Sequence, residues 1–165
     1  MKHLSLLLIC SLSLMLTGCG FKLRGSNSLP PQMQQIQLQA TSDYDALYQV
    51  VKTRLQNHQV TVSTDSLASV PTIRLVKDEL ERRLLSLFTS GQVAEYELVY
   101  TVNYLLMLPD QEAQAIQFDI VREYQDDPNA VLAKSRELDL ILKEMRTQAA
   151  DKIIRQLANP NEITR

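Results

Sequence analysis

The stretch VAEYELVYTVNYLLML, residues 93–108, decides the fold of this 165-residue chain. Every second position from Ala94 to Leu108 carries an alanine, valine, leucine or tyrosine, and glutamates, threonine and asparagine lie among the positions between them. Period-two alternation in Val, Tyr and Thr is typical of a β-strand with one buried face. A strand of this length needs a partner of similar length, which the preceding sequence supplies.

Residues 72–88 are that partner, although their pattern is ambiguous. The first half alternates as a strand does, whereas leucines spaced by four in the second half also fit a helix over 77–88. A β-bulge inserts one residue and changes the phase of the alternation, so a bulged strand accounts for the whole segment. Because Ser90 and Gly91 are a tight-turn signal, we predict a long hairpin of 72–88 with 93–108.

Downstream of the hairpin, the sequence predicts one more strand and a long helix. Pro109 and Asp110 signal a turn, and alternation over 116–124 predicts the strand. Asp127 followed by Pro128 is typical of an N-cap and a first helical residue. Apolar residues then recur at i, i+4 and i+7, which predicts an amphipathic helix of roughly 25 residues.

Upstream of the hairpin, a strand, a helix and a second strand are predicted in succession. Residues 36–40 alternate, with Gln37 on a polar outer face; a glutamine-rich, aggregation-prone tract is the less favoured alternative. Apolar residues at i, i+4 and i+8 predict a helix over 43–57, and residues 60–62 predict a short strand. The order strand, helix, strand indicates one parallel pair.

These elements predict an α+β fold in a single domain, a mixed sheet of four to five strands with two helices packed on one face. The domain is expected to span 32–158 and to be followed by a polar tail, 159–165. The face of the sheet without helices carries Glu, Thr, Asn and Asp. We expect that face to meet water or a partner.

The first residues predict secretion and lipidation. Lys2 precedes an almost unbroken apolar run, which is shorter than the ~20 residues of a membrane-spanning helix and fits a secretory signal peptide. The run ends in LTGC, which resembles the lipobox of bacterial lipoproteins, where cleavage precedes the cysteine and its thiol is acylated. We therefore expect a signal peptide over 1–18, lipidation of Cys19 and a lipidated tether over 19–31.

The composition excludes several classes of function. Without the leader the net charge is about −3, which argues against general nucleic-acid binding. Only Gly91 of the four glycines lies inside the predicted domain, which excludes glycine-rich phosphate loops. One remaining histidine, His58, cannot form a zinc site without free cysteines, so we expect no metal and no cofactor. A Ser-His-Asp hydrolase using His58 is a formal alternative to a structural role at a helix end.

Basic residues are the main candidates for ligand contact. Lys134 and Arg136 lie near the start of the predicted last helix, where a positive charge opposes the helix dipole, and this hints at anion binding. Arg82 and Arg83 form a second compact basic pair. Both pairs also fit a solvated surface. The glutamate pairs of the strands fit solvated edges better than catalytic acids, and the tyrosine stripe of 93–108 fits a core.

Several motifs in order resemble those of a known family. They are CGFKLR at 19–24, GQVAEY at 91–96, TVN at 101–103, and DP, LAK, KEM, AA and IRQL between 127 and 157. This combination resembles the LptE family of lipopolysaccharide-assembly lipoproteins. The resemblance implies a mixed sheet with two helices and a non-enzymatic role.

The resemblance also implies partners and a location. Family members are lipid-anchored to the inner leaflet of the Gram-negative outer membrane, facing the periplasm or the lumen of the large β-barrel LptD. They plug and help assemble that barrel and bind lipopolysaccharide for delivery to the outer leaflet. By the resemblance, the candidate barrel contacts are at the central turn: Gly91, Gln92, Glu95 and Tyr96.

For lipopolysaccharide, the family uses basic residues around the central turn and on the final helix. Lys134 matches the helix position, whereas Thr89 stands at the turn position and is not a cation. Arg82 or Arg83 is the candidate replacement. The alternative function is a generic outer-membrane scaffold lipoprotein without a lipid ligand.

Overall fold

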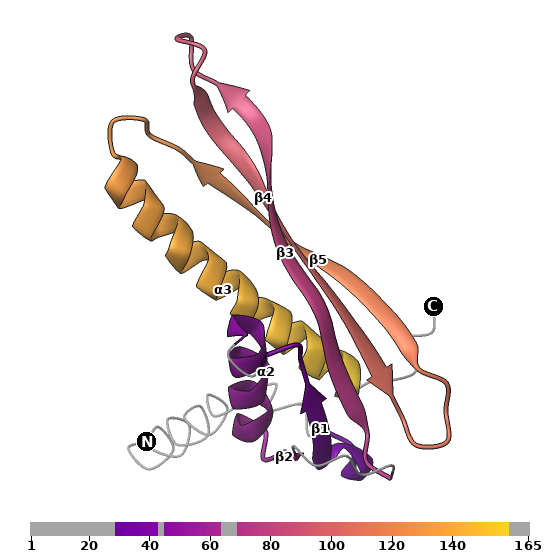
Figure 1. Ribbon diagram of the computed structural model, residues 1–165. Helices are drawn as coiled ribbons and strands as arrows, with labels where there is room; N and C mark the ends of the chain where they lie inside the picture. Colours follow the sequence, from indigo (N-terminus) through magenta and orange to yellow (C-terminus); the bar gives the residue numbers. More distant parts are fainter. Residues whose placement is uncertain (1–28, 43–44, 64–68, 159–165) are drawn as a thin grey trace, which may run out of the picture.

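The computed structural model describes residues 29–42, 45–63 and 69–158, and Figure 1 shows their arrangement. The described elements, in chain order, are η2 (Pro31–Met33), β1 (Gln35–Gln39), α2 (Ala46–Asn57), β2 (Thr61–Ser63), β3 (Thr72–Leu87), β4 (Val93–Met107), β5 (Gln114–Gln125) and α3 (Val131–Ala158). The five strands form one sheet in the order β2-β1-β3-β4-β5. β1 is parallel to both β2 and β3, and the other pairs are antiparallel. The predicted α+β architecture, a mixed sheet with two helices, is confirmed.

The predicted signal peptide, Cys19 and the tail 159–165 lie outside the described residues, as does most of the tether. The inner end of the tether is described and belongs to the core. Leu29 is only 8% exposed and packs in the same hydrophobic cluster as the strands. The packed domain therefore begins before residue 32.

The long hairpin of β3 and β4 is confirmed, and residues 77–88 are strand rather than helix. The two strands pair from Thr72 with Met107 to Leu87 with Val93, with register shifts after Leu75 and around Ser86. These irregularities change the phase of the side-chain alternation within β3, which explains the helix-like spacing of its leucines.

The hairpin turn is closed by two backbone hydrogen bonds. The Gly91 N–H donates to the Phe88 carbonyl at 2.9 Å, and the Phe88 N–H donates to the Gln92 carbonyl at 2.8 Å. Gly91 has φ of +84°, a conformation that only glycine adopts without strain. The turn therefore needs glycine at this position for its backbone, as in three-residue hairpin loops with a left-handed third residue.

The expected polar outer position of Gln37 is wrong. Gln37 is only 4% exposed, and its Oε1 accepts a hydrogen bond from the Thr72 hydroxyl at 3.0 Å. β1 lies between β2 and β3 in the sheet, so its side chains have neighbours on both sides. A buried amide is tolerated there because it has a hydrogen-bond partner.

Both helices begin later than predicted. α2 begins at Ala46, and the Asp45 carboxylate caps it by accepting hydrogen bonds from two backbone N–H groups of the first turn. Asp127 is not the N-cap of α3. Its carboxylate accepts from the Asn129 N–H at 2.9 Å in a separate turn, and α3 begins at Val131. The predicted N-cap is therefore wrong, because Asp127 stabilises the turn that precedes the helix.

The core occupies one end of the molecule, where α2, the C-terminal half of α3 and β1 meet the long strands (Figure 1). Met145, Ala149, Ile153 and Leu157 of α3 are fully buried, whereas Leu132 near its start is 79% exposed. The hairpin end and the N-terminal half of α3 project beyond this core (Figure 1). Within the described part of the chain, neither helix combines the length and the hydropathy needed to cross a membrane.

Candidate functional site

Lys134 lies in the first turn of α3 and is held against β5. Its ammonium is 2.7 Å from Glu137 Oε2 and 4.7 Å from the centroid of the Tyr124 ring. The Tyr124 hydroxyl donates to the backbone carbonyl of Lys134 at 2.9 Å. The lysine side chain is therefore fixed at both its backbone and its charged end, and only 16% of it is exposed.

Tyr124 belongs to an aromatic pair on the helix side of the sheet. Its ring stacks on that of Tyr96, its cross-strand partner in β4, with centroids 6.5 Å apart. Tyr96 pairs in turn with Leu84 of β3, so these three side chains form one row across the hairpin. The row ends at Leu84, which is exposed. The rings of Tyr96 and Tyr124 in this row form an aromatic floor beneath the start of α3.

Arg82 lies on the same side as this row. Its cross-strand partner is Leu98, which is fully buried beneath the helices, and directly paired residues point to the same face of a sheet. The charge of Arg82 also acts on the Tyr124 hydroxyl. The structure therefore brings two of the four basic candidates, Arg82 and Lys134, to one aromatic floor.

The ionisation of this cluster is stable at neutral pH. Partial burial is the main cause that raises the pKa of Tyr124; Asp126 and Glu137 add to the rise, and Lys134 and Arg82 oppose it. The hydrogen bond to Glu137 is the main cause that raises the pKa of Lys134. The phenol therefore remains neutral and the ammonium charged, which preserves the geometry.

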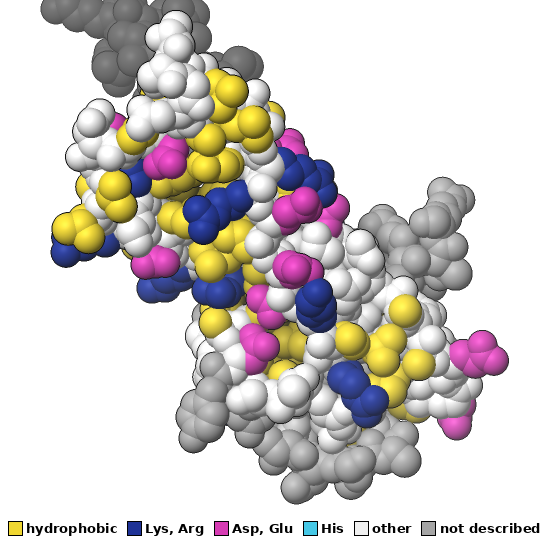
Figure 2. Space-filling model, turned by 45° about the horizontal axis from the view of Figure 1, so that its top comes forward, with side chains coloured by type: hydrophobic (Ala, Val, Ile, Leu, Met, Phe, Trp, Pro, Cys, Tyr) yellow, Lys and Arg dark blue, Asp and Glu magenta, His cyan; other side chains and the backbone are white. Residues whose placement is uncertain are grey.

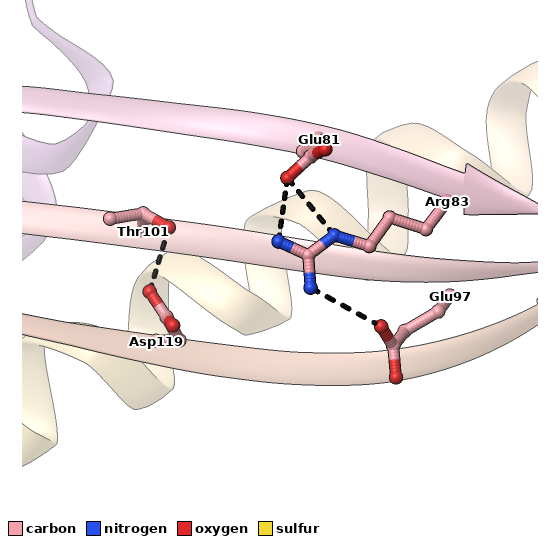
Figure 3. Close-up of polar contacts among 5 residues, drawn as sticks. All are labelled: Glu81, Arg83, Glu97, Thr101 and Asp119. Atoms are coloured by element: carbon pink, nitrogen blue, oxygen red, sulfur yellow. Dashed lines mark hydrogen bonds and ion pairs between the residues drawn. The ribbon is translucent and has the colours of Figure 1, made fainter.

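Arg83 lies on the opposite face of the sheet, which carries no helix. Figure 3 shows its guanidinium between two carboxylates: Glu81 Oε2 at 2.8 Å and Glu97 Oε2 at 3.7 Å. The hydrogen bond that Arg83 donates to Glu81 is the main cause that raises the pKa of Arg83. Neighbouring residues of a strand point to opposite faces, so Arg82 and Arg83 do not act as one basic pair.

Arg136 is exposed on α3, two residues after Lys134. Two residues correspond to a rotation of about 200° around a helix. The structure therefore does not bring Arg136 to the aromatic floor that contacts Lys134.

The hairpin end is apolar and exposed, a feature that is not among the predictions from the sequence. Leu84, Leu85, Leu87 and Phe88 are between 46 and 56% exposed, and Val131 and Leu132 at the start of α3 are exposed as well. Figure 2 shows hydrophobic and basic side chains intermixed on the face seen when the top of Figure 1 is brought forward. The sequence does contain a signal for this exposed apolar surface, because the apolar residues of 84–88 lie at the end of a strand that extends beyond the helices.

The four candidate barrel contacts are divided between the turn and both faces. Gly91 and Gln92 lie in the turn next to Thr89, and Tyr96 is on the helix side. Glu95 lies on the helix-free face, where its carboxylate accepts hydrogen bonds from Ser86 and from Gln125 of β5. The structure therefore does not collect these four residues on one surface.

His58 is not part of this site and has a structural role at the end of α2. It is the C-cap of α2, and its backbone N–H donates to the Arg54 carbonyl at 3.2 Å. Among the residues that the structure describes, no three His, Cys, Asp or Glu side chains are grouped as a metal site would require. The fold and the site define an α+β domain whose projecting end combines cations, aromatic rings and exposed apolar side chains.

Comparison with known proteins identifies the family. The family model "LptE: Lipopolysaccharide-assembly" matches residues 33–157. An LPS-assembly lipoprotein LptE of Photorhabdus laumondii is 34% identical over 158 residues, which are 95% of this chain and 87% of that protein. The chain belongs to the LptE family of lipopolysaccharide-assembly lipoproteins, which are not enzymes.

Other relatives agree with this family and with the fold. The LPS-assembly lipoprotein LptE of Yersinia enterocolitica is 33% identical over 159 residues, covering 95% of this chain and 77% of that protein. The crystal structure of rare lipoprotein B from Shewanella oneidensis has a TM-score of 0.72 at 44% identity, covering 77% of this chain and 96% of that one.

Proposed function

We propose that this chain is an outer-membrane lipoprotein, anchored through a lipidated Cys19, that binds lipopolysaccharide and plugs the β-barrel LptD during lipopolysaccharide assembly. The observation that carries the lipid contact is the position of Lys134 over the Tyr124 ring, on the same face of the sheet as Arg82 and beside an exposed apolar hairpin end. Membership of the LptE family supports the same role.

The chemistry of this end suits an anionic amphiphile. Lipopolysaccharide carries phosphates, for which lysine and arginine are the natural donors. It also carries acyl chains, and contiguous exposed apolar side chains on a soluble domain mark surfaces that bind apolar partners. Leu84 lies in the same cross-strand row as Tyr124, so the apolar and the cationic parts adjoin.

The helix-free face suits the polar lumen of a barrel. Its charged side chains are mainly acidic: Glu79, Glu81, Glu95, Glu97, Asp119 and Glu123, with Arg74, Lys77 and Arg83 as cations. Several of these groups already have hydrogen-bond partners within the sheet, such as Asp119 with the Thr101 hydroxyl at 2.7 Å (Figure 3). A face of this kind seats against a polar wall without burying unpaired charge.

Two experiments test the proposed function. The lipidated chain, extracted in detergent, should co-purify with LptD, and a photo-crosslinking residue at Gln92 in the hairpin turn should give a barrel adduct. The same residue at Gln111, in the turn between β4 and β5 at the other end of β4, is the control. Recovery of the chain alone, with normal barrel assembly in its absence, would refute the barrel role.

The lipid contact is tested by charge reversal. Lys134→Glu should weaken binding to lipopolysaccharide, whereas Lys143→Glu, an exposed position further along α3, should not. Equal binding by both variants would favour the alternative of a scaffold lipoprotein without a lipid ligand. The ion pair that Lys134 already makes with Glu137 is the observation that favours this alternative.

A further inference from the structure

The Glu137 carboxylate lies against the Lys134 ammonium, in the position that an anionic ligand would take. Its Oε2 is 2.7 Å from the lysine Nζ, a distance typical of charge-assisted hydrogen bonds. The two side chains differ in exposure: 49% for Glu137 and 16% for Lys134. The carboxylate is therefore the partner on the solvent side, and it can leave while the ammonium stays in place.

Tyr124 holds the ammonium independently of Glu137. Its ring lies 4.7 Å from Nζ, and its hydroxyl donates to the Lys134 carbonyl. An ammonium has three N–H donors, so contact with the ring face and one carboxylate leaves donor capacity for a further oxygen. Loss of the Glu137 contact would leave the lysine oriented by the ring.

An ion pair whose only role is to stabilise the helix would have the opposite order. Acidic residues toward the N-terminus and basic residues toward the C-terminus favour the helix dipole. Here the lysine is the fourth residue of α3 and the glutamate follows it. The pair therefore serves helix stability poorly, and the packing of Lys134 on a strand tyrosine is not needed for it.

We propose that Glu137 is an internal competitor for the anion-binding position at Lys134, and that Tyr124 is the positioning residue that keeps the ammonium in that position. This inference rests on the proposed contact between Lys134 and lipopolysaccharide. An incoming phosphate replaces the Glu137 carboxylate at Nζ without rearrangement of the lysine. Affinity for the phosphate is lowered by this competition, which favours release after delivery.

The test measures binding of the full-length lipidated chain, in detergent, to immobilised lipopolysaccharide and to lipopolysaccharide stripped of its phosphates. Glu137→Gln should tighten binding to the phosphorylated form about threefold, the scale of one exposed ion pair. Tyr124→Leu should weaken it about threefold, the scale of one cation–π contact, and Tyr124→Phe, which keeps the ring, should weaken it less. The phosphate-free form should not distinguish the variants.

Matched variants separate this inference from general effects of charge and packing. Glu144→Gln removes an exposed carboxylate elsewhere on α3, and Tyr104→Phe removes a hydroxyl that bonds Gln156 at the core end of the helix. Neither should change binding. In a Lys134→Ala background, Glu137→Gln should lose its effect, and thermal melting reports whether Tyr124→Leu and Tyr124→Phe remain folded.

Two results would overturn the inference in distinguishable ways. If Lys134→Ala weakens binding but Glu137→Gln behaves like Glu144→Gln, the competition is absent and the proposed lipid contact stands. If Lys134→Ala leaves binding unchanged, the proposed contact at this lysine fails and the inference fails with it.

Discussion

Removing the Thr72 hydroxyl should destabilise the fold through the buried amide of Gln37. Thr72→Val keeps the size and the branching of the side chain but leaves Gln37 Oε1 without the donor that now lies 3.0 Å away. Both residues are less than a tenth exposed, so water cannot easily replace this donor. A buried acceptor left unsatisfied costs about 1–3 kcal/mol, and we expect about 2 kcal/mol here.

The energy of the pair itself is measured by a double-mutant cycle. Replacing both partners with apolar groups, as in Gln37→Leu with Thr72→Val, removes the unsatisfied oxygen together with its donor and should recover most of the loss. Urea denaturation followed by circular dichroism gives the free energy of unfolding of the wild type, both single variants and the double variant.

The reasoning would be refuted by either of two results. Thr72→Val could unfold at the same urea concentration as the wild type, which would mean that the hydroxyl contributes nothing. Alternatively, the double variant could lose the sum of the two single losses, which would mean that the two groups do not interact. Thr61→Val, the same substitution at an exposed position of β2, is the control for loss of a hydroxyl that water can replace.

Four further predictions concern single residues. Burial is the main cause that raises the pKa of Tyr100 far above its unfolded value of about 10. The folded state therefore holds this proton more tightly, so the free energy of unfolding should be unaffected below pH 10 and fall above it. In a plot of melting temperature against pH, Tyr100→Phe should reduce the fall above pH 10. Gly91→Ala meets no atom within 4 Å but should cost about 1 kcal/mol in the hairpin because of its positive φ, with faster amide exchange near the turn. His58→Ala should leave lipopolysaccharide assembly unchanged in a complementation assay, because His58 caps α2 through its backbone N–H. Loss of all function would instead support a hydrolase that uses this residue. Cys19→Ala should abolish lipidation, and an unmodified Cys19 thiol in the wild-type protein by mass spectrometry would contradict the lipobox.

The hairpin and the last helix could be predicted because their signals are local. The alternation over 93–108 follows from one buried face, and β4 spans Val93–Met107 as expected. The assignment of residues 72–88 required the long neighbouring strand, since a bulge and a helix produce similar leucine spacing over a short segment. A strand with a clear alternating pattern can therefore be assigned from that pattern alone, and it also decides the assignment of the ambiguous segment that must pair with it.

The candidate site could be predicted only in its residue types. Lys134 stands against the helix dipole, and this was visible in the sequence. The separation of Arg82 from Arg83 was also implied by the strand, whose neighbouring residues face opposite ways. The contact of Lys134 with Tyr124 was not visible, because these residues belong to different elements and the turn between them sets their distance.

The sequence by itself determined the pattern of strands and helices, the lipoprotein signature and the family, since these depend on periodicity and on short motifs. Only the tertiary structure decided which polar groups are buried and which are paired. Gln37 is buried and bonded to Thr72 of the neighbouring strand, and Asp127 stabilises a turn because α3 begins after it. The physical reason is that burial and hydrogen-bond partners are properties of neighbours in space, which alternation along one segment does not specify.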